Sequence, residues 1–286
     1  MPILKSLVKN TAARSAAELV NRVGSALFWI AVVRVLGTAG FGSLSFSMSL
    51  FALFATFSTF GLGAVLIRDV ARDCSRAGAY FGHSMLLGLG SAVIAAALMN
   101  GAVLLLDTSR ETVLATRIMS TALLPASLFY WSKALLSAAE KMSKSALART
   151  AENVFKIGAG LAVLLTGGDL LLVVGVVAVS KWVSAFVAFF YARRIAVPVW
   201  RPQRPLFAYL LRQVPTFSLI SIFNSLIWTM PVILLTHTLG EGAAGVFSAA
   251  FKLVDLLLTF AAAYGQALFP IASRTLQDNR RVFEIL

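Results

Sequence analysis

The chain has 286 residues, of which 59% are hydrophobic and only 13% are charged. A soluble domain is closer to half apolar and a quarter charged, so this composition excludes a water-soluble globule and predicts a surface covered by lipid. The net charge of +13 would favour nucleic-acid binding in a soluble protein, but its distribution along the chain argues against that class. Cys74 is the single cysteine, and His83 and His237 lie far apart, so spacing predicts neither an internal disulfide nor a metal site.

Several apolar segments are long enough, or nearly so, to cross a bilayer, whose core requires about 20 residues of helix. In chain order they are residues 13–35, 42–67, 83–106, 113–136, 151–167, 170–192, 215–238 and 244–270. The fifth is the weakest, because Glu152 and Lys156 lie in its first turns, where they can pair and extend toward the membrane surface. The sequence therefore predicts an all-α, polytopic membrane protein with about eight transmembrane helices.

Basic residues are concentrated in alternate loops. The N-terminus, the loops after the second, fourth and sixth segments, and the C-terminal tail carry Lys5, Lys9, Arg14, Arg68, Arg72, Arg76, Lys141, Lys144, Arg149, Arg193, Arg194, Arg201, Arg204, Arg212, Arg274, Arg280 and Arg281. The other loops carry Arg110 together with Asp107, Glu111, Asp169 and Glu241. The positive-inside rule therefore predicts that both termini are cytoplasmic, and it assigns most of the net charge to orientation in the membrane.

The segment of residues 201–215 is too short to span, and its apolar residues between arginines favour a surface helix at the cytoplasmic face, with a plain polar loop as the alternative. We interpret it as a linker between two parts of the chain. Residues 1–200 are expected to form an N-terminal lobe of six membrane helices. Residues 201–286 are expected to contain the linker and the first two helices of an incomplete second lobe.

An internal repeat supports this division. Shifted by 203 positions, residues 2–57 align without a gap on residues 205–260, with 13 identities in 56 positions. The matches that carry most weight are Asn21 with Asn224, Gly37 with Gly240, and Gly42 with Gly245. Because six segments separate the two copies, both cross the membrane in the same direction, as the parallel repeats of some transporters do. The second copy is unfinished at Leu286, so the chain is expected to be a fragment, a truncated gene product or a partial repeat.

Charged residues inside the membrane segments are costly and usually face a cavity or a partner. The candidates for substrate binding are Arg22, Lys181 and Lys252, with Glu18 and Asp255 as supporting ion pairs at helical spacing and Arg34 and Arg117 as contacts near the outer ends. Lys181 has no carboxylate at helical spacing within its own segment. If these residues share a cavity, that cavity is cationic and suits a phosphate or pyrophosphate.

Five runs resemble bacterial polysaccharide-biosynthesis flippases, which belong to the multidrug/oligosaccharidyl-lipid/polysaccharide exporter superfamily. They are residues 34–46 (RVLGTAGFGSLSF), 60–72 (FGLGAVLIRDVAR), 138–142 (AAEKM), 250–253 (AFKL) and 268–270 (LFP). The resemblance implies two six-helix lobes around a central cavity that contains basic residues. Arg22 in helix one and Lys252 in helix eight would be among these cavity residues. It also implies movement of a polyprenyl-pyrophosphate-linked oligosaccharide across the bacterial inner membrane for O-antigen, capsule or exopolysaccharide synthesis.

The resemblance implies no enzyme, catalytic residue, cofactor or metal. The expected partners are the anionic lipid-linked oligosaccharide, membrane lipid and other membrane proteins of polysaccharide assembly, without nucleic acid. Three alternatives stay open: a cation-coupled exporter of small molecules in the same superfamily, which predicts an acidic cavity; a membrane enzyme such as a glycan polymerase or ligase, which usually needs a large outer loop; and an inactive, truncated remnant.

Overall fold

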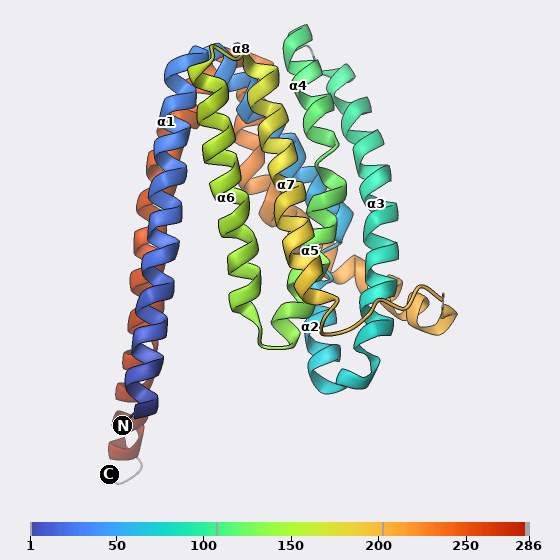
Figure 1. Cartoon of the computed structure of the whole chain (residues 1–286), viewed down its shortest axis with the longest axis vertical. Helices are drawn as coiled ribbons and strands as arrows, with labels where there is room; N and C mark the ends of the chain where they lie inside the picture. Colours follow the sequence, from blue (N-terminus) through green and yellow to red (C-terminus); the bar gives the residue numbers. More distant parts are fainter. Residues whose placement is uncertain (1, 107, 202, 284–286) are drawn as a thin grey trace. The chain divides into compact units, whose positions relative to one another are not determined.

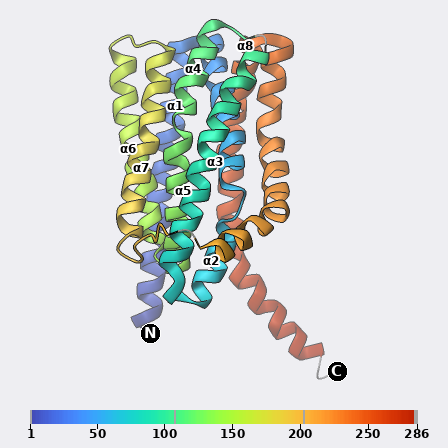
Figure 2. The same cartoon turned by 90° about the vertical axis from the view of Figure 1, so that its right-hand side faces the viewer.

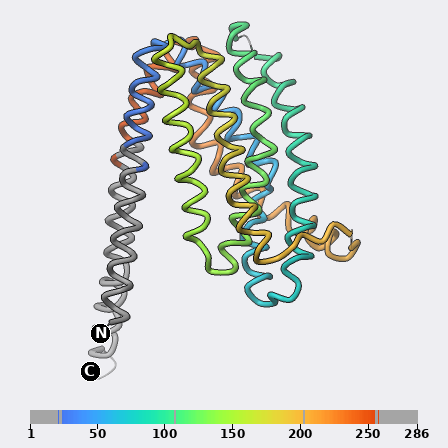
Figure 3. The backbone as a smooth tube through the Cα atoms, viewed as in Figure 1, coloured from blue at the N-terminus to red at the C-terminus, as the bar shows by residue number. Residues whose placement is uncertain are grey.

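The computed structural model describes the backbone of residues 2–106, 108–201 and 203–283, and the side chains of residues 21, 24–106, 108–201, 203–254 and 257 (Figure 3). Every regular element in these ranges is helical (Figure 1). The elements are α1 (Pro2–Thr59), α2 (Gly63–Arg72), a short 3-10 helix (Cys74–Arg76), α3 (Ala77–Leu105), α4 (Arg110–Ser120), α5 (Leu123–Ala138), α6 (Met142–Leu165), α7 (Leu170–Ala192) and α8 (Arg204–Phe283).

Five helical segments in the described part of the chain are long and apolar enough to cross a membrane. They are Gly24–Arg72, Cys74–Leu105, Arg110–Ala138, Leu170–Ala192 and Arg204–Val254. The first and the last, 49 and 51 residues long, exceed one crossing because each contains a glycine with left-handed backbone, Gly37 at φ 69° and Gly240 at φ 83°. The all-α polytopic fold is thus confirmed, while the count of eight crossings stays a prediction.

The two glycine turns belong to hairpins that touch each other through their backbones. A Cβ atom added to Gly42 would overlap the carbonyl oxygen of Glu241, and one added to Gly245 would overlap the carbonyl oxygen of Thr38. All these positions are related by the same shift of 203 residues that aligns the sequence with itself. A contact in which each copy offers the same surface to the other is typical of a two-fold relation. The structure therefore supports the internal repeat.

Glu241, directly after the second glycine turn, holds the start of α4. Its Oε1 accepts hydrogen bonds from the Ser109 backbone N–H (3.1 Å), the Ser109 hydroxyl (2.6 Å) and the Thr112 hydroxyl (2.5 Å). A carboxylate at a helix N-terminus is favourable because the first N–H groups of the helix lack partners within it. The second hairpin is therefore attached both to the first hairpin and to α4.

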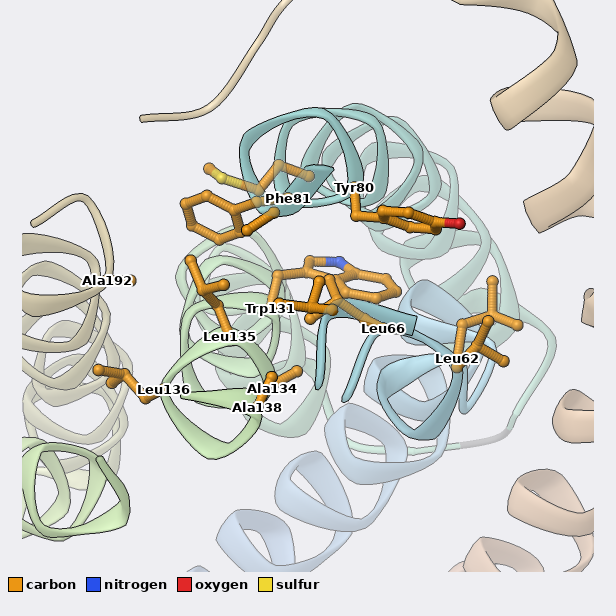
Figure 4. Close-up of a cluster of buried hydrophobic side chains, with 14 of the residues drawn as sticks. Leu62, Leu66, Tyr80, Phe81, Trp131, Ala134, Leu135, Leu136, Ala138 and Ala192 are labelled. Atoms are coloured by element: carbon orange, nitrogen blue, oxygen red, sulfur yellow. The ribbon is translucent and has the colours of Figure 1, made fainter. Parts of the chain in front are cut away.

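A cluster of buried apolar side chains joins α2, α3 and α5 around Trp131 (Figure 4). The Trp131 side chain is 0% exposed and is surrounded by Leu66, Tyr80 and Phe81. Gly88 of α3 makes room for it, since a Cβ atom at this position would overlap the indole Nε1. Membrane helices gain little from expelling water and rely on such close packing, so this cluster fixes the relative positions of three helices.

The chain between α7 and α8 is fastened to α3. The Val199 backbone N–H donates to the Gly78 carbonyl (2.9 Å), and the Gln203 backbone N–H donates to His83 Nε2 (2.7 Å). His83 is fully buried, and its Nδ1 lies 2.7 Å from the Ala79 carbonyl oxygen. With Nε2 accepting, Nδ1 must donate, so these contacts select one neutral tautomer. His83 therefore has a structural role at this connection.

The start of α8 forms the helix that the sequence predicts for the linker. Leu206 and Leu210 are buried, whereas Arg204 and Arg212 are exposed. Figure 2 shows this segment lying across the bundle before α8 turns to run along it. A helix, and not a plain polar loop, is thus observed from Arg204, and its place at the cytoplasmic face stays a prediction.

By its contacts the chain divides into two compact units, Met1–Ser248 and Ala249–Leu286, the second of which is the continuation of α8. The predicted lobes of residues 1–200 and 201–286 stay a prediction.

The hairpin contact predicts that a methyl group added to Gly42 or Gly245, which we call the crossing glycines, destabilises the protein. We expect Gly42→Ala and Gly245→Ala each to cost about 1–3 kcal/mol, because backbone atoms must move apart. Thermal unfolding in detergent, followed by tryptophan fluorescence, measures the change. Gly90→Ala is the matched control, since an added Cβ there meets nothing within 4 Å. Unfolding midpoints of both crossing variants equal to that of Gly90→Ala would contradict the prediction.

Candidate functional site

Polar and charged side chains line a hollow of about 370 Å³ inside the first unit, among α1, α5, α6 and α7. Its lining residues are Phe51, Ala55, Ala126, Phe129, Arg149, Glu152, Asn153, Lys156, Lys181 and Ser184. Charged groups are expensive within an apolar bundle and are retained there mainly for function. This hollow is therefore the candidate site.

Lys181, singled out from the sequence because its own segment offers no carboxylate, obtains one from the neighbouring helix. Lys181 Nζ of α7 lies 2.6 Å from Glu152 Oε1 of α6, with side-chain exposures of 28% and 12%. Ser184 lines the same hollow one turn along α7. The pair neutralises two charges that would each be costly alone in this environment.

Lys156 lies deeper, and it corrects a sequence prediction. Its residue exposure is 9%, and its Nζ donates to Asn153 Oδ1 (3.0 Å) and Ser25 Oγ (3.4 Å). Sequence spacing predicts that Glu152 and Lys156 extend to the membrane surface, whereas Lys156 is buried and Glu152 forms an ion pair with Lys181. Because α6 begins at Met142, about three turns before Glu152, the two residues lie well inside the helix and not in its first turns.

A second hollow of about 260 Å³ adjoins the first and contributes another cation. Phe129 and Arg149 line both hollows, and Lys133 lines the second. The Arg149 guanidinium carbon lies 5.8 Å from the centre of the Phe129 ring. Tyr130 also lines the second hollow, and its hydroxyl accepts a hydrogen bond from the Gly63 backbone N–H (2.9 Å). The hydroxyl thereby holds the start of α2 beside the site.

The two hollows together are strongly biased toward positive charge. Four cations line them, Lys133, Arg149, Lys156 and Lys181, against the single carboxylate of Glu152. In the part of the chain whose side chains are described, no group of three or more His, Cys, Asp or Glu residues is placed to hold a metal ion. Ammonium and guanidinium groups bind the oxygens of phosphates and carboxylates. The arrangement can therefore bind an anion.

The other residues predicted from the sequence have different positions. Arg34 and Arg117 are exposed and line neither hollow. Lys252 is partly buried and belongs to the second unit. The side chains of Glu18, Arg22 and Asp255 lie outside the described residues. Of the four predicted residues whose side chains are described, Lys181 is thus the one that the structure places in this site.

The sequence reasoning missed Arg149, Glu152, Lys156 and Lys133 as members of the site. The distribution of basic residues assigns Arg149 to a cytoplasmic loop, whereas it lies within α6. A usable signal existed, because Arg149, Glu152, Asn153 and Lys156 follow the i, i+3, i+4, i+7 spacing of a single helix face. Starting the helix at Met142 would have revealed it.

Comparison with known families identifies the chain. Residues 7–276 match the family described as "Polysaccharide biosynthesis protein". The chain belongs to this family. No curated protein matches the sequence closely enough to count as a relative.

Two solved structures share the fold of this family member. One is described as the inward-facing conformation of a multidrug resistance MATE family transporter of the MOP superfamily, with a TM-score of 0.59 and 17% identity over 85% of this chain and 58% of that one. The other, named only "protein A", has a TM-score of 0.60 and 15% identity over 91% of this chain and 64% of that one. The chain thus spans less than two thirds of the length of either structure.

The ion pair predicts unequal effects of single and double substitutions. Lys181→Ala leaves Glu152 without its partner, and Glu152→Ala does the same to Lys181, so each should cost about 1–3 kcal/mol of unfolding free energy. The double variant removes both charges and should be more stable than either single variant. Thermal unfolding of all four proteins in detergent measures the coupling. Additive losses would show that the two side chains do not interact.

Proposed function

We propose that the protein moves a polyprenyl-pyrophosphate-linked oligosaccharide across the bacterial inner membrane for the synthesis of O-antigen, capsule or exopolysaccharide. Family membership and the fold shared with a MOP-superfamily transporter support a membrane transporter of the polysaccharide pathway. The excess of cations in the two hollows is the observation that supports an anionic substrate. Movement between leaflets breaks no covalent bond, so a binding site of changing access is sufficient.

The chemistry of the hollow fits the head of such a lipid. A pyrophosphate presents several anionic oxygens, and a planar guanidinium can bind two of them with parallel hydrogen bonds. Arg149 stands at the boundary of both hollows, and Lys133 lies in the second. Lys181 is already neutralised by Glu152. We therefore assign the first contact with the substrate to Arg149 and Lys133, and a supporting role to the ion pair.

A small-molecule exporter is the second candidate, because one similar structure is described as a multidrug resistance transporter. A cation-coupled exporter of cationic compounds would require carboxylates in its cavity. Among the described residues the hollows contain one carboxylate, and it is paired with Lys181. The charge of the site therefore favours the lipid-linked sugar.

Removal of Arg149 tests the assignment. We expect Arg149→Ala to lower the rate of flipping at least about tenfold, the usual effect of losing one charge-assisted hydrogen bond of about 1.5–3 kcal/mol. The protein encoded by the whole gene is reconstituted in vesicles with a fluorescent polyprenyl-pyrophosphate oligosaccharide. Chemical quenching of the fluorophores in the outer leaflet then reports their exchange between leaflets.

Two controls make this result specific. Arg149→Lys keeps the charge and should retain part of the rate, whereas Arg76→Ala removes an exposed arginine that lines neither hollow and should leave the rate unchanged. A wild-type rate for a folded Arg149→Ala protein would refute the role of the hollow. Efflux of a cationic dye without flipping of the lipid would instead support the exporter.

The native cysteine tests the proposed orientation with both termini in the cytoplasm. Cys74 is exposed, in the short helix between α2 and α3, and it lies on the side predicted to be cytoplasmic. A membrane-impermeant maleimide should label it in lysed cells and leave it unlabelled in intact spheroplasts. The variant Cys74→Ser with Ser109→Cys places the thiol on the predicted outer side and should reverse the pattern. Labelling of Cys74 in intact spheroplasts would show that the chain has the opposite orientation in the membrane.

A further inference from the structure

One side of α7 carries a row of exposed aromatic residues that the proposed transport site does not use. Trp182, Phe186 and Phe190 follow at four-residue spacing, which places them along one face of the helix. Their exposures are 37%, 59% and 48%, and the rings of Trp182 and Phe186 stack with centres 5.4 Å apart. The α7 groove, a hollow of about 590 Å³ at the end of this row, is lined by Phe186, Val187, Phe189, Phe190, Tyr191 and Arg193.

The aromatic row points away from the transport site. An α-helix rotates by about 100° per residue, so Phe186 and Phe190 lie on the side of α7 opposite to Lys181 and Ser184. Lys181 and Ser184 line the first hollow of the candidate site, and Ser184 is 1% exposed. The exposed residues of the α7 groove, Phe186, Phe190 and Arg193, therefore lie on the side of α7 away from the first hollow.

Three cations gather at the end of this groove. Arg193 lines it, the Arg194 guanidinium carbon lies 4.2 Å from the centre of the Phe190 ring, and Lys144 Nζ lies 4.9 Å from the centre of the Tyr191 ring. None of the three is within ion-pair distance of a carboxylate among the described side chains. Contact with the ring faces positions Arg194 and Lys144 without neutralising them, so positive charge gathers at this end of the groove.

We propose that the α7 groove binds an anionic glycerophospholipid of the cytoplasmic leaflet. An acyl chain would lie along Phe186 and Phe190, and the phosphate would lie among Arg193, Arg194 and Lys144. Basic pockets at the cytoplasmic ends of membrane helices bind anionic headgroups, and each nearby Lys or Arg strengthens the attraction. The proposed substrate, a lipid-linked sugar, fits the α7 groove less well, because the site proposed for it lies on the other side of α7.

Trp182 provides the probe. The whole protein is placed in nanodiscs containing either phosphatidylglycerol or phosphatidylcholine with brominated acyl chains, at equal mole fractions. Subtracting the quenching of Trp182→Phe from that of the wild type isolates the signal of Trp182. We expect stronger Trp182 quenching by the brominated phosphatidylglycerol. In Arg193→Ala/Arg194→Ala this preference should fall roughly tenfold, following the loss of two surface cations.

A matched variant and a competitor complete the test. Arg201→Ala/Arg204→Ala also removes two exposed arginines, but neither lines the groove, so it should keep the preference for phosphatidylglycerol. Equal quenching by both lipids, or an unchanged preference in Arg193→Ala/Arg194→Ala, would overturn the proposal. Displacement of the brominated lipid by equimolar polyprenyl phosphate would also overturn it, by assigning the groove to the substrate. These readings detect lipid contact and not transport, so they stand apart from the flippase proposal.

Discussion

The backbone contact between two glycine-turned hairpins is the constraint on which the first unit depends. Gly42 and Gly245 must lack side chains, because each faces a carbonyl of the other hairpin. Gly37 and Gly240 must accept left-handed backbone for the hairpins to form at all. Since all four positions obey one shift of 203 residues, the repeat is preserved where geometry leaves no choice of residue.

The candidate site follows a different constraint, the cost of charge in an apolar bundle. Lys181 and Glu152 come from different helices and neutralise each other, whereas Arg149 keeps its charge at the boundary of two hollows. Glu152 thus lowers the cost of one cation while the net charge of the site remains positive. Such a site can attract an anion through its excess positive charge, while the pairing of one cation lowers the cost of burial.

Membrane helices and their hairpins were predictable because composition and the spacing of glycines act locally along the chain. The turn at Gly240 follows directly from the match to Gly37 in the sequence. The site was less predictable, because the partner of Lys181 lies 29 residues away on another helix. Helix periodicity within α6 alone could not show that Lys181 of α7 joins Glu152. Assigning Arg149 to a loop also hid the polar face of α6, since loop and helix residues of mixed polarity look alike locally.

The two ends of the first unit differ in how easily water can replace their contacts. Glu241 is held by two hydroxyl groups and one backbone N–H, and each such bond has a net worth of about 0.5–1.5 kcal/mol because water forms equivalent bonds. The Trp131 cluster is apolar and fully buried, so parting its helices would leave voids that water cannot fill favourably. If the proposed transport requires helices to move apart, the hydrogen bonds of Glu241 would therefore break more readily than the packing of α2, α3 and α5.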